Sequence, residues 1–109
     1  MQLMTKAIEN ALNKQKGGLY AQDGMGLISK VVVKYFNPCG VGTWYITAGE
    51  KQEDGDWLLF GYVQLQFNEW GYVRLSELKN LKVGFMGLGI ERDIAIKPLT
   101  KTVEQLIRF

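Results

Sequence analysis

The sequence predicts a small single α+β domain, in which a mostly antiparallel sheet of four or five strands is packed by an N-terminal helix and short later helices. A chain of 109 residues has the length of one domain. Its strand-like segments are rich in β-branched and aromatic residues in alternating patterns. The expected order of helix, three-strand meander, short helix, strand and helix lacks the regular alternation of a parallel α/β fold. We therefore treat residues 1–109 as one domain.

The first expected element is a helix that begins after Thr5, a favourable N-cap residue. Gly17-Gly18 ends it, and the next residues, 19–27, have the composition of a loop. One face of the helix carries a narrow apolar stripe at helical spacing, formed by Ala7, Ile8, Ala11 and Leu12. A narrow stripe indicates a helix that lies across one face of a sheet.

Three strands are expected next, over residues 28–36, 43–48 and 57–67. The turn sequence Asn37-Pro38-Cys39-Gly40 joins the first two as a hairpin. In the third strand the odd positions are apolar throughout, whereas the even positions become polar towards Gln66. One face of this strand is therefore expected in the core while the other emerges into solvent.

The remaining elements are short. Ser76 is a candidate cap for a brief helix, and Thr102 with Gln105 matches a capping box for the last helix. The predicted segments are a strand at 72–75, a helix at 76–81, a glycine-rich loop at 83–89, a strand at 92–97 closed by Pro98, and a final helix that ends near Arg108.

Composition excludes several classes of function. The chain has no His and one Cys, which excludes Cys/His zinc sites, His-based catalytic triads and an internal disulfide. A formal net charge of +2 gives no strong footprint for nucleic acid and excludes an acidic DNA mimic. The unpaired Cys39, the absence of a signal-peptide pattern and the shortness of every apolar stretch favour a cytoplasmic protein with no membrane span.

Carboxylates are the first candidates for chemistry. The loop that contains Glu50, Glu53, Asp54 and Asp56 is rich in ligands for a hard cation. It lacks the spacing of an EF-hand loop, so a solvated hairpin loop is the favoured interpretation. No metal and no cofactor are predicted from this segment.

A second acidic set is Glu69, Glu91 and Asp93. Scattered acids that converge on one site are typical of metal-dependent hydrolases and nucleases. On a strand, Glu91 and Asp93 would share one face and Arg92 would point to the other. Structural ion pairs are the favoured interpretation, with Arg74 and Arg92 as the expected partners.

Nucleophilic catalysis and phosphate binding have weaker support. Cys39 has no His to activate it, and Ser76 is interpreted as a helix cap. The glycines of residues 83–89 do not stand between a strand and a helix, as a phosphate-binding loop requires. We expect no catalytic residue and no cofactor.

Aromatic residues form the third candidate. The chain has thirteen, and most are expected in the core. An exposed minority around Trp70 and Tyr72, with Arg74 close by, predicts a protein-binding hot spot, because Trp, Tyr and Arg dominate such sites. Trp44 and Tyr45 are the further expected anchors. Stacking of single-stranded bases is the alternative, but it also requires basic side chains on the same face.

Several motifs follow one another along nearly the whole chain. After Pro38 come T-W-x-x-T at 43–47, E-x-G-Y-V-x-L-S-E-L at 69–78 and E-R-D at 91–93. The set resembles a family of small uncharacterised bacterial proteins that carry a domain of unknown function and occur largely on plasmids, phages and other mobile elements. The sequence departs from the family in Trp70, where Leu is frequent, and in the glycine-rich segment at 83–89.

The resemblance implies a cytoplasmic protein of mobile-element origin. Together with the aromatic residues it predicts a non-catalytic protein-binding protein, a candidate counter-defence inhibitor of the anti-CRISPR type that acts on a host nuclease. The expected partner-binding residues are Trp44, Tyr45, Trp70, Tyr72 and Arg74. The alternatives are a metal-dependent hydrolase or nuclease that uses Glu69, Glu91 and Asp93, and a weak binder of single-stranded nucleic acid.

Overall fold

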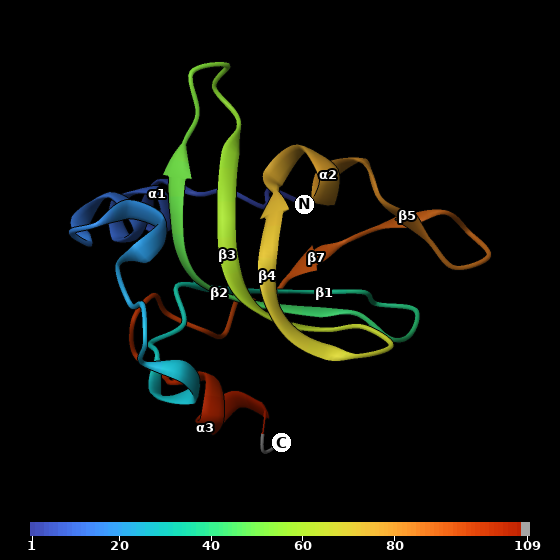
Figure 1. The fold of residues 1–109 in the computed structure, drawn as a ribbon. Helices are drawn as coiled ribbons and strands as arrows, with labels where there is room; N and C mark the ends of the chain where they lie inside the picture. Colours follow the sequence, from blue (N-terminus) through green and yellow to red (C-terminus); the bar gives the residue numbers. More distant parts are fainter. Residues whose placement is uncertain (108–109) are drawn as a thin grey trace.

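A computed structural model describes residues 1–107, and its centre is a five-stranded sheet in which every neighbouring pair is antiparallel (Figure 1). The strand order is β4-β3-β2-β1-β7. The strands are β1 (Val33–Phe36), β2 (Thr43–Lys51), β3 (Trp57–Gln64), β4 (Asn68–Arg74) and β7 (Glu91–Arg92). The predicted α+β class and the mostly antiparallel sheet are confirmed.

Short elements surround this sheet. The described residues form three α-helices, α1 (Lys6–Lys14), α2 (Leu75–Asn80) and α3 (Val103–Ile107). Two 3-10 helices, η1 (Gly18–Tyr20) and η2 (Gly26–Ile28), lie between α1 and β1. A separate hairpin is formed by β5 (Lys82–Val83) and β6 (Leu88–Gly89). Within residues 1–107, no helix is both long and apolar enough to cross a membrane.

Two of the predicted helix caps are confirmed. The backbone N–H of Ile8 donates to the Thr5 hydroxyl over 3.2 Å at the start of α1. Thr102 and Gln105 exchange reciprocal hydrogen bonds of 2.9 and 3.1 Å before α3. Ile8 is buried in the predicted stripe together with Ala11 and Leu12, whereas Ala7 is exposed. The expected end of the last helix at Arg108 lies outside the described residues.

The strand boundaries differ from those predicted. The first strand starts only at Val33, because Ile28 belongs to η2, and Lys30 and Val31 pair instead with Thr102, Lys101 and Leu99. The third strand ends at Gln64, and the fourth is longer than predicted, since it begins at Asn68. These shifts lengthen the β3–β4 pairing and leave residues 65–67 as an exposed turn.

The region after β4 also differs. The second helix begins at Leu75, so Ser76 lies within its first turn and does not cap it. The glycine-rich residues 83–89 are largely the β5–β6 hairpin. The predicted strand at 92–97 is reduced to β7, because the chain turns after Asp93, whose carboxylate accepts a hydrogen bond from the backbone N–H of Ala95.

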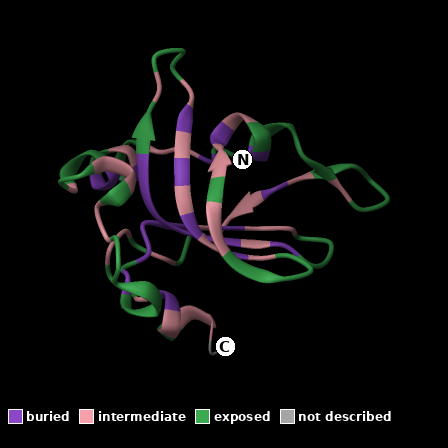
Figure 2. Cartoon of the chain, viewed as in Figure 1, coloured by how far each residue is buried: buried purple, intermediate pink, exposed green. Residues whose placement is uncertain are grey.

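Opposite faces of the sheet are covered by different elements. The face that contains Trp44 packs against α1 and α2, and with them it forms the main hydrophobic core. The face that contains Tyr45 packs against α3 in a smaller cluster with Val31 and Val103. Burial is concentrated in the central strands, and the loops at both ends of the sheet are exposed (Figure 2). The edge strand β4 is the least covered of the long strands.

Candidate functional site

The edge strand β4 contributes to two surfaces. It lies at one end of the sheet and, among the described residues, pairs with β3 alone. Trp70 and Tyr72 project from one face, and Glu69, Gly71 and Val73 belong to the other, because successive residues of a strand alternate. A partner that reaches this edge therefore has access to both faces.

On one face, five rings form a continuous row, which we call the aromatic row: Tyr45, Tyr62, Trp70, Phe60 and Tyr72. The centroids of successive rings are 6.5, 5.2, 5.8 and 5.0 Å apart. The row changes from buried to exposed along its length. Tyr45 is 4% exposed, whereas Tyr72 is 54% exposed.

The C-terminal helix covers the buried end of the aromatic row. Tyr45 packs with Val103, and burial raises its pKa, with a further contribution from the neighbouring Tyr62. The Lys34 ammonium lies 5.7 Å from the centre of the Tyr45 ring and forms an ion pair of 3.9 Å with Asp93. Lys34 is thus already paired at the covered end of the row.

The other end of the aromatic row is open. A cavity of about 270 Å³ lies beside it, lined by Gln22, Asp23, Gly24, Gly26, Ser29, Phe60 and Trp70. Tyr72 follows as the last ring of the row. The open end therefore combines an exposed ring with a cavity of mixed polar and apolar lining.

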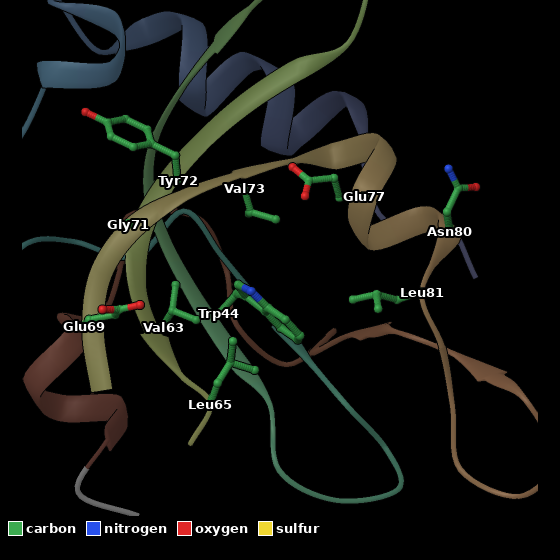
Figure 3. Close-up of a pocket in the computed structure, with 10 residues that line it drawn as sticks. All are labelled: Trp44, Val63, Leu65, Glu69, Gly71, Tyr72, Val73, Glu77, Asn80 and Leu81. Atoms are coloured by element: carbon green, nitrogen blue, oxygen red, sulfur yellow. The ribbon is translucent and has the colours of Figure 1, made fainter. Parts of the chain in front are cut away.

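On the opposite face, β4 and α2 enclose a hollow of about 530 Å³, which we call the β4–α2 pocket (Figure 3). Trp44 lies across its middle, and the Tyr72 side chain points away from it. The lining residues are mostly apolar and include two carboxylates but no Lys or Arg: Trp44, Val63, Leu65, Glu69, Gly71, Tyr72, Val73, Glu77, Asn80 and Leu81.

The five predicted anchors differ in their burial and in the face of the sheet on which they lie. Trp44 is 6% exposed and lies on the face opposite Tyr45, so the five residues do not form one surface. Trp70 is half-buried between Phe60 and Tyr62. Of the four aromatic anchors, Tyr72 is the most exposed.

Arg74, the fifth predicted anchor, is held by the β2–β3 loop. Its guanidinium lies 3.9 Å from a carboxylate oxygen of Asp54 and 3.7 Å from one of Asp56. It therefore does not pair with the acids of the second predicted set. Arg74 remains 43% exposed and lies at the rim of the aromatic face.

The acidic loop that was considered as a hard-cation candidate has a structural role through Asp56. Its carboxylate accepts hydrogen bonds from the Ser76 hydroxyl (2.6 Å) and from the backbone N–H groups of Ser76 and Trp57. The Ser76 hydroxyl is the main cause that lowers the pKa of Asp56, and the backbone donors and Arg74 add to it against the opposing effect of burial. The Asp56 carboxylate is therefore engaged in hydrogen bonds and an ion pair within the protein.

The second acidic set does not converge. Glu69 is on β4 at one edge of the sheet and Glu91 is on β7 at the other, with three strands between them. As expected, Glu91 and Arg92 occupy opposite faces, but Asp93 pairs with Lys34 and the Arg92 side chain donates to the Gln2 carbonyl. In residues 1–107, no three His, Cys, Asp or Glu side chains are grouped so that they could hold a metal ion.

Sequence reasoning missed a group of exposed apolar side chains on three loops, which we call the apolar tips: Val41, Leu65, Phe67, Phe85 and Met86. The β1–β2, β3–β4 and β5–β6 loops that carry them extend towards the same side of the molecule (Figure 1). The Cys39 thiol lies 4.0 Å from the Val83 carbonyl oxygen and brings two of these loops together. The sequence feature that could have indicated this group is the apolar pair Phe85-Met86 between two glycines. We had interpreted this pair as part of a flexible loop.

Comparison with known proteins gives one match. A family model described as "Protein of unknown function (DUF2958)" matches residues 3–106. No curated protein and no solved structure shows significant similarity to the chain.

Proposed function

The chain belongs to the DUF2958 family, and we propose that it acts as a non-catalytic binding protein that docks on another protein through the open end of the aromatic row. The observation that carries this proposal is Tyr72. Its ring is 54% exposed at the sheet edge and is supported by Phe60, whose ring centre is 5.0 Å away. A large, preorganised aromatic side chain is the usual anchor of a protein interface.

The other predicted residues take different parts in this interface. Trp70 is the half-buried second anchor, in contact with both Phe60 and Tyr62. Arg74 contributes at the rim, where Asp54 and Asp56 hold its guanidinium in place. Tyr45 supports the row from its buried end, whereas Trp44 acts on the opposite face.

The partner class in this proposal is a host protein in the bacterial cytoplasm, most concretely a defence nuclease of the CRISPR type. It rests on the resemblance of the sequence to proteins of mobile elements. A counter-defence inhibitor of this kind works by covering a surface that its target needs. Such a role requires a stable binding face and no catalytic group in the inhibitor.

Single-stranded nucleic acid is less well suited to the aromatic row. A base-stacking surface works together with free cations that follow the phosphate backbone. Here Lys34 is paired with Asp93 and Arg74 with Asp54 and Asp56. The rings therefore favour a protein partner.

Capture from bacterial lysate tests the proposal. The tagged protein is used before and after complete digestion of nucleic acid, in parallel with Tyr72→Ala and Tyr20→Ala. Tyr20 is a suitable control because it is a tyrosine that is 66% exposed on η1 and does not belong to the aromatic row. We expect a protein that survives digestion and is retained by Tyr20→Ala but lost by Tyr72→Ala.

Binding measurements with the purified partner then give the loss of affinity. Tyr72→Ala should weaken binding by about 2 kcal/mol, or roughly 30-fold, with an unchanged melting temperature. Equal binding by Tyr72→Ala and wild type would contradict the aromatic interface. Loss of the captured band on digestion of nucleic acid would favour the single-strand alternative.

A further inference from the structure

We infer that the β4–α2 pocket is a second binding site, which takes a segment of a partner protein with an apolar side chain flanked by Lys or Arg. The pocket lies on the face of β4 opposite the aromatic row, so this inference does not depend on Tyr72. It rests on two features of the pocket: its apolar floor and its charge.

The floor favours an apolar side chain. Val63, Val73 and Leu81 line the pocket around Trp44, and a volume of about 530 Å³ is within the range of ligand sites. Gly71 keeps this space open. A Cβ atom placed at Gly71 would meet nothing within 4 Å, and the backbone there has no positive φ. Any larger residue at this position would extend into the hollow.

The charge of the pocket favours a cationic neighbour for that side chain. Glu69 and Glu77 lie on its rim, and no Lys or Arg lines it, although the whole chain carries a net charge of +2. The nearby lysines of α2 and β5, Lys79 and Lys82, line a different cavity together with Met1 and Ile90. Negative charge is therefore concentrated on one side of α2.

Trp44 places a large aromatic ring at the centre of the pocket. Its side chain is more than nine-tenths buried and lies across the middle of the pocket (Figure 3). Within residues 1–107, no buried side-chain nitrogen or oxygen lacks a hydrogen-bond partner, so the indole N–H of Trp44 is not an unsatisfied buried donor. Trp44 therefore favours an apolar occupant through its ring, and its indole N–H serves as a reporter of binding.

The apolar tips favour a protein over a small molecule. Phe67, Phe85 and Met86 are each at least 77% exposed, on loops that extend towards one side of the molecule. Exposed apolar side chains gathered on one side are typical of protein interfaces. An anionic membrane is disfavoured, because the carboxylates of Glu69 and Glu77 would be repelled by it.

A pair of peptides tests the inference. The basic probe is acetyl-Lys-Phe-Arg-Leu-Lys-amide, and its acidic twin replaces each basic residue with Glu. Binding is followed by 15N NMR of the three Trp indole N–H groups, assigned with Trp44→Phe. We expect the basic peptide to shift the Trp44 signal in a saturable way while the signal of the core residue Trp57 stays in place, and the acidic twin to have no effect.

Two variants localise the binding. Gly71→Leu should fill the pocket and abolish the shift, whereas Gly89→Leu, which also has open space around its Cβ position, should retain it. Glu69→Gln should weaken binding about two- to fivefold, as expected for an exposed charge pair, and Glu53→Gln in the β2–β3 loop should not. If Gly71→Leu fails to fold, Gly71→Ala combined with Glu69→Gln replaces it.

Several outcomes would overturn the inference. These are an unshifted Trp44 signal, equal binding of the acidic twin, or unchanged binding by a folded Gly71→Leu protein. Equal shifts with phenethylamine would indicate a small-amine site instead of a peptide site. Tyr72→Ala should leave the Trp44 shift intact, so failure at this pocket and failure of the aromatic interface are distinguishable.

Discussion

Gly61 on β3 and Gly71 on β4 are directly paired on neighbouring strands, yet the space around their Cβ positions differs completely. A Cβ atom at Gly61 would collide with the carbonyl oxygen of Tyr45 on β2, where a bulge between Ile46 and Ala48 changes the register. The same atom at Gly71 would enter open space. One glycine is required by the packing of the central strands, whereas the other leaves a hollow that the fold itself does not need.

The two ends of the sheet show the same difference. At the β2–β3 end, Asp56 binds Trp57, Ser76 and Arg74 and so ties the loop to the start of α2. At the other end, the apolar tips are exposed on three loops. The β2–β3 end is closed by hydrogen bonds within the protein, whereas the end with the apolar tips exposes apolar side chains to solvent. This contrast places the stabilising interactions in the centre and at the β2–β3 end, and it agrees with the proposal that binding occurs at the edge.

The largest expected effect is the difference in stability between substitutions at Gly61 and at Gly71. Gly61→Ala should destabilise the protein by about 3 kcal/mol, because β2 and β3 must move apart to admit the methyl group. Gly71→Ala should stabilise it by roughly 0.5 kcal/mol, since Ala loses less conformational entropy than Gly in a strand. Urea unfolding followed by circular dichroism measures both values. Equal destabilisation by the two substitutions would contradict the difference in packing.

The next effect concerns the closed end. Asp56→Ala should lower the free energy of unfolding by about 2 kcal/mol, because three donors lose a charged acceptor. Asp54→Ala is the control and should cost less than about 0.5 kcal/mol, since its ion pair with Arg74 and the hydrogen bond that it accepts from the Asp56 backbone N–H are both exposed.

The pH dependence of this end has a defined sign. The pKa of Asp56 is lower in the folded protein than its ordinary value of 3.8. The stabilisation is therefore fully present above pH 3.8 and is lost as the pH falls through the lower, folded pKa. Acid titration of the unfolding free energy should show a shallower decline for Asp56→Asn than for wild type.

A smaller effect on stability is expected at alkaline pH from the core residue Tyr35. Tyr35 is fully buried and donates to the Leu3 carbonyl over 2.7 Å, and burial raises its pKa well above 10, against a smaller opposing effect of Arg92. Its contribution to stability is present below pH 10 and lost as the pH rises further, because the unfolded state releases the proton first. Tyr35→Phe should cost about 1 kcal/mol at neutral pH and should weaken the decline above pH 10. An unchanged alkaline slope would contradict this assignment.

The smallest effect on stability is expected at the apolar tips. Phe85→Ser should change the free energy of unfolding by less than about 0.5 kcal/mol, because its side chain is fully exposed at the end of the β5–β6 hairpin. Binding of the partner protein should nevertheless decrease. Calorimetry of the pure variant and partner capture measure the two effects separately. A large loss of stability would show that Phe85 has a structural role.

The difference between these regions also explains which predictions succeeded. Thr5 caps α1, and Thr102 with Gln105 caps α3, as expected, because a cap depends on residues three positions apart. The alternation along Trp57 to Gln64 correctly indicated a buried and a half-buried face. Ser76 was misassigned as a cap because its partner, Asp56, is twenty positions away.

By itself, the sequence determined the α+β class, the antiparallel meander and the first and last helix starts, since local propensity and side-chain periodicity control them. Only the tertiary structure decided that Trp44 and Tyr72 lie on opposite faces of the sheet with different exposure, that Glu69 and Glu91 are at opposite edges, and that the apolar tips extend to one side. Exposure depends on which distant element covers a given face. Here α3 covers one end of the aromatic row and leaves Tyr72 open, while α2 stops short of filling the space above Trp44.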